Sequence, residues 1–376
     1  MIALPQDVAF IIHKIEKAGF EAFAVGGCIR DSLLSRIPND WDITTSALPE
    51  QVKALFPHTI DTGIKHGTVT VMCHHVGYEV TTYRIDGEYE DGRHPKQVVF
   101  TPSLIEDLKR RDFTINAMAY NDSRGLVDAF EGQQDLQKGV IRAVGEPEKR
   151  FSEDALRIMR AVRFAAQLGY TIEEETEAAM CRLSDTLTKI SAERIQVELV
   201  KLLVSDHPGH MKILYETGIT KVILPEFDRM METEQNNPHH LYSVGMHTIR
   251  AMEEVPADKV LRLTMLFHDM GKPAKKTTDA EGIDHFHGHA ELSAKMAKEI
   301  LQRLKFDNDT IGKVTKLVKN HDRKIIPHAK YVRRALCDLG EEIFLLLLEV
   351  KHADVMAQST CRREEKLEGL VLSLIH

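Results

Sequence analysis

Two aspartates one residue apart, Asp40 and Asp42, are the first side chains in this chain that could do metal chemistry. We predict a strand over residues 40–44, on which both carboxylates point to one face, about 7 Å apart, while Trp41 faces the core. That geometry can hold divalent cations between carboxylates, as two-metal phosphoryl transfer requires. A polar turn is the alternative, because 57 acids in 376 positions give about nine acid-x-acid pairs by chance.

A glycine pair upstream changes the weight of that pattern. Gly26 and Gly27 follow a predicted strand (residues 23–27) and precede a predicted helix (residues 29–34). Backbone N–H groups at such a helix start favour a triphosphate, and Arg30 lies one turn into the helix, where it can pair with the phosphates. A strand, a phosphate nest and a carboxylate strand, in that order, predict a polymerase-like active site.

Charged residues recur every third position within residues 152–168, which we predict to be one helix. They form a slowly turning stripe that consists of Asp154, Arg157, Arg160 and Arg163. One interpretation is an i,i+3 ion-pair ladder on a solvated face. The other is a base reader, because cytosine and adenine each offer an amine donor beside a ring-nitrogen acceptor. A carboxylate and a guanidinium satisfy that pair, whereas uracil and guanine present the reverse order.

Histidines and acids recur from residue 247 onward. They are His247, His268 with Asp269, His289, His321 with Asp322, and Asp354, with His285 and His287 as weaker candidates. Nitrogen and carboxylate ligands on several helices of a bundle suit Mn, Fe, Ni, Mg or Zn. For any one of these histidines alone, a surface or buried residue without a metal is the simpler interpretation.

The first third of the chain mixes helix and strand signals. Apolar residues at helical spacing predict a first helix over residues 5–19, and residues 67–84 predict a strand pair that turns at Val76-Gly77. Residues 84–95 are polar and contain glycines, which predicts a mobile loop. Ser103 followed by Glu106 predicts a capping box for the next helix.

Strand signals fade after about residue 135, and helical patterns such as residues 191–203 dominate to the end. We therefore predict an α+β protein in three parts: a mixed α/β head (residues 1–135), a helical neck (residues 136–235), and an all-helical domain with most of the histidines (residues 236–376). Pro225 and the polar residues 232–238 mark the expected linker.

Composition indicates a soluble globular protein, with 43% hydrophobic and 28% charged residues. The longest apolar run, residues 343–348, is far short of the roughly 20 residues that span a bilayer. Five scattered cysteines without a C-x-x-C pair fit a reducing compartment, so we expect a cytoplasmic protein without membrane contact. A net charge of -8 means that an RNA partner would need local basic surface. The sequence does not specify the oligomeric state.

Taken together, Gly26-Gly27-x-x-Arg30-Asp31 and Asp40-x-Asp42 resemble the signature of the DNA polymerase β nucleotidyltransferase superfamily. Four further stretches resemble the class II tRNA nucleotidyltransferases (CCA-adding enzymes), relatives of bacterial poly(A) polymerases. They are RRDFTINAMA (110–119), DAFEG (128–132), EDALRIMRAVRF (153–164) and ERIQVEL (193–199). The resemblance covers most of residues 20–203. It implies template-independent addition of CCA to tRNA 3′ ends from CTP and ATP, with Mg²⁺ as the metal of the head.

The same resemblance implies roles for single residues. It gives metal binding and catalysis to Asp40 and Asp42, and base choice to Asp154 and Arg157. It places Arg111, in preference to Arg110, near the ribose or phosphates, with Asp112 and Asn116 shaping the sugar site. The nucleotide-binding set is then Gly26, Gly27, Arg30, Arg111, Asp112, Asn116, Asp154, Arg157, Arg160 and Arg163. Glu79, on a predicted strand, is either a third carboxylate or a plain surface acid.

The histidine-rich region resembles the HD phosphohydrolase domain. This implies His247, His268, Asp269 and Asp354 as core ligands of a divalent metal, with His289 and His321 extending the site to two metals. In such nucleotidyltransferases the HD region is sometimes a phosphatase or phosphodiesterase, for instance towards 2′,3′-cyclic phosphates, and sometimes only a body that grips tRNA.

Alternatives stay open at this point. The resemblance implies that the loop over residues 84–93 (the switch loop) takes part in the switch from C to A addition, so its presence argues against a CC-adding enzyme. An A-adding tRNA nucleotidyltransferase or a poly(A) polymerase fits the same motifs. In a different class, the head senses RNA or nucleotides and the HD domain is the only enzyme. Relatives usually continue past the HD region in a helical tail, so a truncated tail is one interpretation of the end at residues 370–376.

Overall fold

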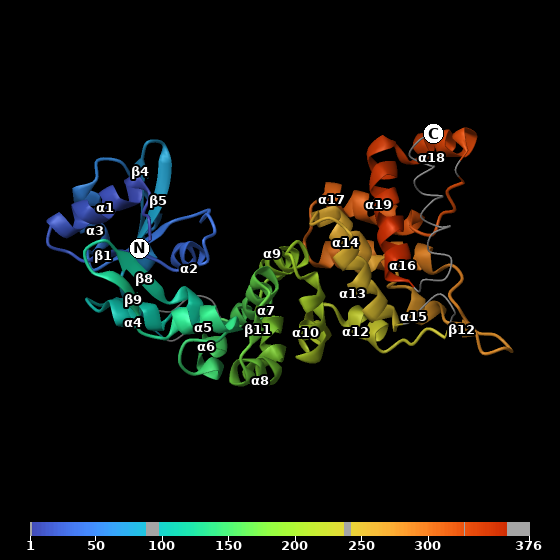
Figure 1. Cartoon of the computed structure of the whole chain (residues 1–376), viewed down its shortest axis with the longest axis horizontal. Coiled ribbons are helices and arrows are strands. Elements are labelled where there is room, and N and C mark those ends of the chain that lie inside the picture. Colours follow the sequence, from blue (N-terminus) through green and yellow to red (C-terminus); the bar gives the residue numbers. More distant parts are fainter. Residues whose placement is uncertain (1, 88–97, 237–241, 327, 359–376) are drawn as a thin grey trace. The chain divides into compact units, whose positions relative to one another are not determined.

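The structure is a computed structural model that describes residues 2–87, 98–236, 242–326 and 328–358. It divides into two compact units, residues 1–161 with 170–183 and residues 162–169 with 184–376. Figure 1 shows a strand-rich first unit and a second unit made almost entirely of helices. The predicted α+β class is therefore confirmed, whereas the three domain boundaries stay a prediction.

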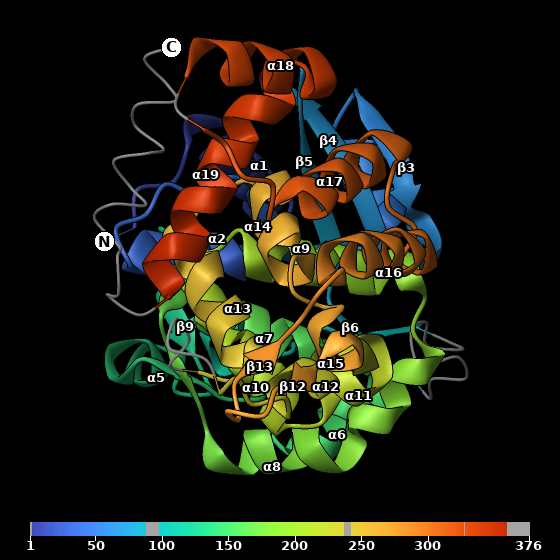
Figure 2. The same cartoon turned by 90° about the vertical axis from the view of Figure 1, so that its right-hand side faces the viewer.

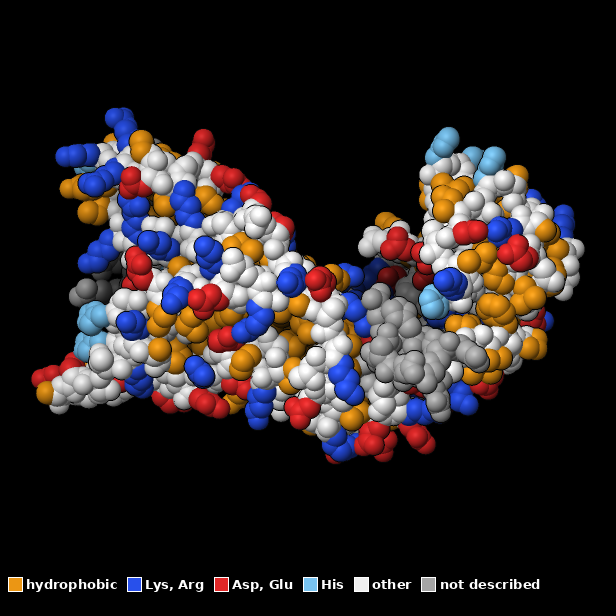
Figure 3. Space-filling model, turned by 180° about the vertical axis from the view of Figure 1, so that it is seen from behind, with side chains coloured by type: hydrophobic (Ala, Val, Ile, Leu, Met, Phe, Trp, Pro, Cys, Tyr) orange, Lys and Arg blue, Asp and Glu red, His pale blue; other side chains and the backbone are white. Residues whose placement is uncertain are grey.

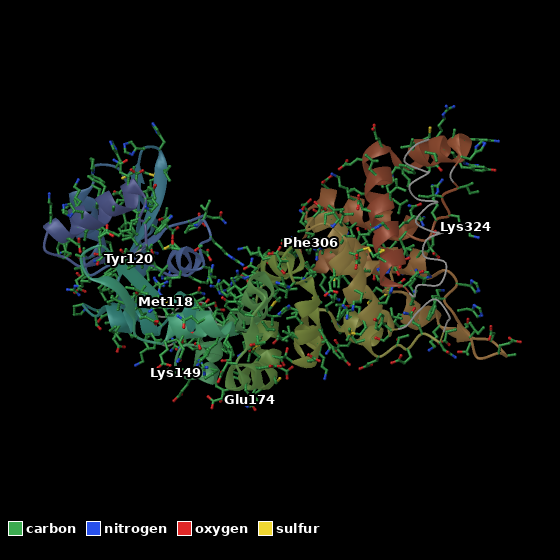
Figure 4. All side chains as sticks on the ribbon, in the orientation of Figure 1. Met118, Tyr120, Lys149, Glu174, Phe306 and Lys324 are labelled. Carbon is green, nitrogen blue, oxygen red and sulfur yellow. The ribbon has the colours of Figure 1, made fainter. Side chains whose placement is uncertain are left out.

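A seven-stranded mixed sheet organises the first unit, in the order β3-β4-β5-β2-β1-β8-β9. Strand β1 pairs antiparallel with β2 and β8, whereas β2 and β5 run parallel. Figure 4 places Met118 and Tyr120 on β8. The strands of the sheet are β1 (Ala22–Val25), β2 (Asp42–Thr45), β3 (Thr59–Gly63), β4 (Thr68–Cys73), β5 (Val76–Thr82), β8 (Met118–Asn121) and β9 (Gly125–Asp128). Two small pairs lie outside it: β6 (Arg84–Asp86) with β7 (Val98–Phe100), and β10 (Val140–Ile141) with β11 (Thr171–Ile172).

Helices of the first unit pack on this sheet. The first predicted helix is confirmed, since α1 buries Val8, Ile11, Ile12 and Ile15. Apolar residues of α4 join Phe23, Val25 and Ala119 of the sheet in one buried cluster. The helices are α1 (Gln6–Lys17), α2 (Gly27–Leu33), α3 (Pro49–Leu55), α4 (Leu104–Lys109), α5 (Gly132–Lys138), α6 (Pro147–Glu153) and α8 (Glu174–Leu183), with 3₁₀ turns η1 (Ile64–His66) and η2 (Thr114–Asn116); α7 (Leu156–Leu168) starts in the first unit and ends in the second.

Two predicted strand boundaries were wrong. The β4–β5 turn lies at His74 and His75, whose φ angles are +47° and +67°, and not at Val76-Gly77. Only glycine and a few polar residues usually adopt positive φ, so the glycine gave a misleading signal. The second strand starts at Asp42, so Asp40 and Trp41 precede it. Ser103 caps α4 as predicted, because its hydroxyl accepts a hydrogen bond from the Glu106 amide.

The second unit contains a helical bundle in which α13, α14, α16, α17 and α19 gather (Figure 2). Its helices are α9 (Ala192–Leu203), α10 (Met211–Glu216), α11 (Ile219–Ile223), α12 (Pro225–Met231), α13 (Val244–Glu254), α14 (Lys259–Phe267), α15 (Lys272–Lys275), α16 (His289–Arg303), α17 (Asn308–Asn320), α18 (Ala329–Leu339) and α19 (Glu341–Ala357), with 3₁₀ helices η3 (Ser184–Lys189) and η4 (Pro208–His210). A two-stranded hairpin of β12 (Thr277–Thr278) and β13 (Asp284–His285) departs from the predicted all-helical second half. In the described ranges, no helix is long and apolar enough to cross a membrane.

Pro225, expected in a linker, is instead the first residue of α12. Proline suits this position because the first turn of a helix leaves its N–H groups without intrahelical partners. The last two residues of the predicted linker, 237–238, lie outside the described residues, which omit residues 237–241. Gln235, just before that gap, is buried and accepts a hydrogen bond from Lys272 at 3.0 Å.

Close packing of α12 on α13 predicts a stability difference between two helical glycines. A Cβ on Gly245 would lie 2.5 Å from Sδ and 2.7 Å from the backbone nitrogen of Met231, whereas a Cβ on Gly312 meets nothing within 4 Å. We expect Gly245→Ala to destabilise the protein by about 1–3 kcal/mol. Gly312→Ala should stabilise it by about 0.5–1 kcal/mol, because alanine is the better helix former. Urea unfolding followed by circular dichroism measures the free energy of unfolding of both variants and of the parent. A Gly245→Ala variant as stable as Gly312→Ala would contradict this packing.

Candidate active site

The loop between β1 and α2 lies beside Asp42 and Arg111. Val25 pairs with Asp42 across the two strands, and Gly26 follows directly with φ +85°, a conformation that favours glycine. A Cβ on Gly26 would lie 2.9 Å from Nη1 of Arg111, so the missing side chain also lets Arg111 approach the loop. Glycine at position 26 therefore allows both the positive φ of the turn and the close approach of Arg111.

Three carboxylates gather beside this loop. Because Ile43 pairs with Val80 in parallel register, Asp42 on β2 lies beside Glu79 on β5. The pKa of Glu79 is raised, first by burial and then by the charges of Asp42 and Asp40. The pKa of Asp42 is also raised, because the surrounding protein displaces water; Arg111 opposes this rise and Asp40 adds to it. Mutual repulsion of this kind favours a cation between the carboxylates.

Asp107, which sequence reasoning missed, anchors both arginines of the RRD stretch. Its buried carboxylate accepts a hydrogen bond from Arg110 Nε at 2.9 Å and lies 3.7 Å from Nη2 of Arg111. Burial alone raises the pKa of Asp107, but the two arginines lower it below its ordinary value. The i,i+3 and i,i+4 spacing on α4 was an available signal. Of the two arginines, Arg111 also lies against Gly26 and interacts with Asp42.

A network of hydrogen bonds joins α2 to α7. Arg30 on α2 donates from Nη1 to Asn116 Oδ1 at 2.8 Å and from Nε to Asp31 at 2.9 Å. Asn116 in turn donates to Asp112 Oδ1 at 3.1 Å, and Arg160 Nε donates to Asp112 Oδ2 at 2.8 Å. Burial alone raises the pKa of Asp112, but Arg160 and Asn116 hold it well below its ordinary range.

The predicted single helix over residues 152–168 was wrong at Asp154. Helix α6 ends at Glu153 and α7 begins at Leu156, while Asp154 between them is extended, with φ -143° and ψ 103°. Its side chain accepts a hydrogen bond from the Leu156 amide at 3.1 Å, so Asp154 caps α7 from outside. An aspartate competes with the helix in this way because its short side chain reaches nearby amides.

Arg157, in the first turn of α7, is held at three points. It donates to Glu153 Oε2 at 2.8 Å, to the Arg150 carbonyl at 3.1 Å and to the Arg110 carbonyl at 3.0 Å. Sequence reasoning also missed Glu153, although it lies four residues before Arg157, at helical ion-pair spacing.

Arg163 does not join these residues in the first unit. It belongs to the second unit, where it pairs with Glu198 and stacks on the Phe164 ring at 3.8 Å. The alternative interpretation, an ion-pair ladder on a solvated face, does not fit the structure, because the side chains of Arg157 and Arg163 are only 11% and 8% exposed. Most of the predicted switch loop lies outside the described residues, which omit residues 88–97.

In the second unit, the structure brings together all six predicted HD residues. Two groups could each hold a cation: His247 with His268 and Asp354, and Asp269 with His289 and His321. Asp269 lies between them, with Oδ2 3.2 Å from His268 Nε2 and Oδ1 3.4 Å from His289 Nε2. A carboxylate in that position can bridge two metal ions.

Hydrogen bonds to backbone carbonyls fix the orientation of three of these histidines. Nδ1 of His268, His289 and His321 lies 2.7, 2.8 and 2.7 Å from the carbonyls of Met265, Phe286 and Val318. A ring whose Nδ1–H donates to a carbonyl turns its Nε2 toward the cluster, where that nitrogen can ligate a metal once it carries no proton. These Nε2 atoms converge, at 3.2 Å between His289 and His321, so the donor set fits a metal centre.

The charges of this cluster also fit a metal centre. Burial alone lowers the pKa of His268, but Asp269 and Asp354 outweigh it and raise the pKa to about 10. Burial alone raises the pKa of both carboxylates, but the histidines, with Lys272 beside Asp269, hold it well below the ordinary range. Buried carboxylates of this kind need positive charge, which a divalent ion can supply.

A pocket of about 280 Å³ opens onto this cluster. Lys272, His285 and His287 line it beside the metal-ligand candidates. The two weaker candidates stack in parallel at 5.7 Å, and His285 contacts Asp279 at 2.7 Å. Neither His285 nor His287 belongs to the two groups.

Comparisons with known families match three consecutive segments. Residues 22–142 match the poly A polymerase head domain, residues 169–231 match a probable RNA- and SrmB-binding site of polymerase A, and residues 239–359 match the HD domain. These matches follow the predicted order of head, neck and HD region.

Curated relatives and solved structures agree on one kind of enzyme. The CCA-adding enzymes of Leuconostoc mesenteroides and Lactiplantibacillus plantarum are each 55% identical, over 54% and 59% of this chain and 51% and 53% of theirs. The chain thus matches about half the length of these relatives. The CCA-adding enzyme of Bacillus stearothermophilus, solved in complex with CTP, is 31% identical over 98% of this chain and 82% of its own, with a TM-score of 0.72. That of Thermotoga maritima, complexed with tRNA, is 20% identical over 100% and 84% of the two chains, with a TM-score of 0.62, and supports the fold.

The glycine loop with its three carboxylates, the Asp154–Arg157 pair and the paired histidine clusters thus occur in a chain that matches such an enzyme over nearly its whole length. The chain therefore belongs to the CCA-adding enzyme family.

Proposed function

We propose that the protein adds CCA to tRNA 3′ ends from CTP and ATP without a nucleic-acid template. The observation that carries this proposal is the meeting of Asp40, Asp42 and Glu79 with Arg111 at the Gly26 loop. Clustered carboxylates beside a fixed guanidinium suit nucleotidyl transfer, which depends on positioning and charge stabilisation. The CTP and tRNA bound in the two solved relatives support the same substrates here.

Asp40 and Asp42 would hold Mg²⁺ in the head, since carboxylate oxygens are its preferred protein ligands. When bound, the metal lowers the pKa of the attacking 3′-hydroxyl and neutralises the leaving pyrophosphate. Arg111 places a positive charge beside these carboxylates, and Asp107 keeps it there. Arg30, oriented by Asn116 and Asp31, would hold the triphosphate at the start of α2.

Asp154 and Arg157 would choose the base. A carboxylate that accepts from the exocyclic amine and a guanidinium that donates to the ring nitrogen match cytosine and adenine alike. Uracil or guanine would leave desolvated groups unpaired at about 1–3 kcal/mol each. The three bonds that fix Arg157 support this role, because a reader must not adapt to the wrong base.

The tRNA would meet local basic surface, since the net charge is -8. On the face seen in Figure 3, lysine and arginine side chains are interspersed with acidic ones over both units. Backbone contacts with RNA are salt-dependent, so we expect tRNA binding to weaken as salt rises. A cytoplasmic location, where tRNA matures, belongs to the same proposal.

A tRNA-end assay tests the head. Transcripts that end at the discriminator base, at C or at CC are incubated with labelled CTP and ATP, and all three should reach CCA. Asp42→Asn should reduce addition on the order of 10³-fold, because it removes a metal ligand. Asp122→Asn, an exposed acid of the same unit, is the matched control.

Each other outcome identifies an alternative. Label that enters only the CC-ended transcript indicates an A-adding enzyme, and long A tails on unrelated RNA indicate a poly(A) polymerase. A parent protein that adds no nucleotide to any transcript, together with equal HD hydrolysis in the parent and in Asp42→Asn, would mean that the head senses nucleotides and that only the HD domain is an enzyme.

Base choice has its own test. Asp154→Ala combined with Arg157→Ala should admit UTP or GTP, with selectivity falling roughly 10- to 100-fold, because the donor and acceptor that reject them are gone. Turnover with CTP should fall less. Competition assays with paired nucleotides measure the ratio, and a ratio equal to that of the parent protein would remove both residues from base selection.

We also propose a metal-dependent phosphatase or phosphodiesterase in the HD region, because two ligand groups share Asp269 beside a polar pocket. The donor set of histidines and carboxylates accepts Mg, Mn, Ni, Fe or Zn.

Metal content and hydrolysis test this second activity together. His268→Ala should lose bound metal, measured by mass spectrometry after dialysis, and should lose hydrolysis of 2′,3′-cyclic nucleotides, since the variant lacks a ligand. CCA addition should persist. His352→Ala, an exposed histidine on the same helix as Asp354, is the control. A parent protein that binds no metal and hydrolyses nothing with Mg, Mn or Ni would indicate a structural role.

A further inference from the structure

The hairpin of β12 and β13 contains an aspartate and histidine pair that belongs to neither metal-ligand group. Oδ2 of Asp279 lies 2.7 Å from Nε2 of His285, and the two side chains are 31% and 39% exposed. Oδ1 of Asp279 accepts hydrogen bonds from the amides of Ile283 and Glu281 at 2.8 and 3.1 Å. The turn therefore fixes the carboxylate, and the carboxylate orients the His285 ring.

The charge of Asp279 determines which nitrogen of His285 stays available to a ligand. The pKa of Asp279 is lowered, first by its hydrogen bond with His285 and then by the Ile283 amide, so this side chain is ionised at neutral pH. An ionised carboxylate only accepts hydrogen bonds, so Nε2 of His285 carries a proton and donates it to Asp279. Among the contacts of the described residues, none involves Nδ1 of this ring. Nδ1 is therefore the nitrogen with which His285 can act on a bound molecule.

Phe286, the next residue along the chain, connects this pair to the metal-ligand cluster. Its carbonyl lies 2.8 Å from Nδ1 of His289, and its ring lies 5.3 Å from Nζ of Lys272. Lys272 in turn lies 2.7 Å from Asp269. The end of β13 is thus attached at two points to the group that contains Asp269 and His289. His285 also lines the pocket of about 280 Å³ onto which the cluster opens, so it borders the space that a phosphate ester would enter.

We propose that His285 is the general acid of the HD site, that Asp279 is its positioning residue, and that the substrates are phosphate esters of sugar hydroxyls. This inference rests on the proposed hydrolytic activity of the HD region. It gives His285 a role in proton transfer that is separate from metal binding. A sugar oxygen is a poor leaving group unless it receives a proton as it departs, which is the chemistry that a positioned imidazole supplies.

The step that needs this acid is the departure of the sugar oxygen. The oxygen of a water molecule forms a bond to phosphorus while the bond from phosphorus to the sugar oxygen breaks, and the electron pair of that bond stays on the sugar oxygen. In its acid form His285 carries a proton on both nitrogens, and Asp279 balances the positive charge. Nδ1 gives its proton to the sugar oxygen, so a hydroxyl leaves. The attacking water releases one proton to solvent, and solvent returns one to Nδ1.

Two kinds of ester separate a general acid from a contact that only stabilises the turn. The sugar oxygen that leaves from 2′,3′-cyclic AMP or 2′-AMP needs a proton, whereas the nitrophenolate that leaves from bis(p-nitrophenyl) phosphate or p-nitrophenyl phosphate is stable as an anion. His285→Ala should lower kcat for the sugar esters about 10²-fold or more, because general acids contribute on that order. Hydrolysis of the nitrophenyl esters should stay within about threefold of the parent, since no proton is needed there.

Further variants test the role of Asp279 and the folding of the site. Asp279→Asn should lower hydrolysis of the sugar esters roughly 10-fold, because an amide no longer balances the charge of the ring. The double variant should be no slower than His285→Ala alone, since both changes act on the same proton. Every variant should retain the metal content of the parent after dialysis. His352→Ala and Asp309→Asn, exposed side chains of the same unit, are the matched controls and should keep parent rates with all four esters.

Three results would overturn the role of His285 alone, with the parent active. They are parent rates on the sugar esters in His285→Ala, an equal fall with both kinds of ester, and a loss of bound metal, which would make His285 a ligand. A parent protein that hydrolyses none of the four esters with Mg, Mn or Ni would refute the proposed HD activity, and the role of His285 with it. The parent rates thus show which of the two proposals has failed.

Discussion

Each oxygen of the Asp112 carboxylate accepts two hydrogen bonds, and those bonds connect segments that are distant in the sequence. Arg160 approaches from α7, and Asn116 continues the contact to Arg30 on α2. A buried carboxylate is costly to leave unpaired, so these donors must keep their places for the head to fold. If the nucleotide binds as proposed, the same contacts also determine where its triphosphate and its base can lie.

The HD cluster depends on charge in a different way. Asp269 and Asp354 are surrounded by histidines, and Lys272 lies 2.7 Å from Asp269. Three of the rings are held through Nδ1, so their Nε2 atoms are committed to the cluster. In the head, by contrast, Asp42 at the start of β2 and Glu79 within β5 are exposed, and Arg111 opposes the rise in the pKa of Asp42. One chain thus combines a histidine-rich cluster that borders a pocket with a carboxylate-rich group on the sheet of the head.

Local signals in the sequence were sufficient for the elements but not for every contact. Apolar spacing predicted α1, and the glycine pair predicted the β1–α2 turn, because both depend on neighbouring residues. The break at Asp154 was missed, since helical periodicity continues through it and only the capping bond to Leu156 reveals it. The contact between Asp112 and Arg160 could not be predicted either, because Arg160 is 48 residues away and the contact arises from tertiary packing. The HD residues were predicted as a set, with His289 and His321 as the extension to a second metal, but the grouping of Asp269 with these two histidines required coordinates.

The three hydrogen bonds of Arg157 also have an entropic consequence. A free arginine side chain carries about 2 kcal/mol of rotamer entropy, which a ligand must restrict when it binds. Here Glu153 and two backbone carbonyls restrict it during folding, before any nucleotide arrives. In the proposed role, a base that docks against Arg157 would therefore lose little of its binding free energy to ordering the protein, so the difference between a matching and a mismatching base would be expressed almost in full.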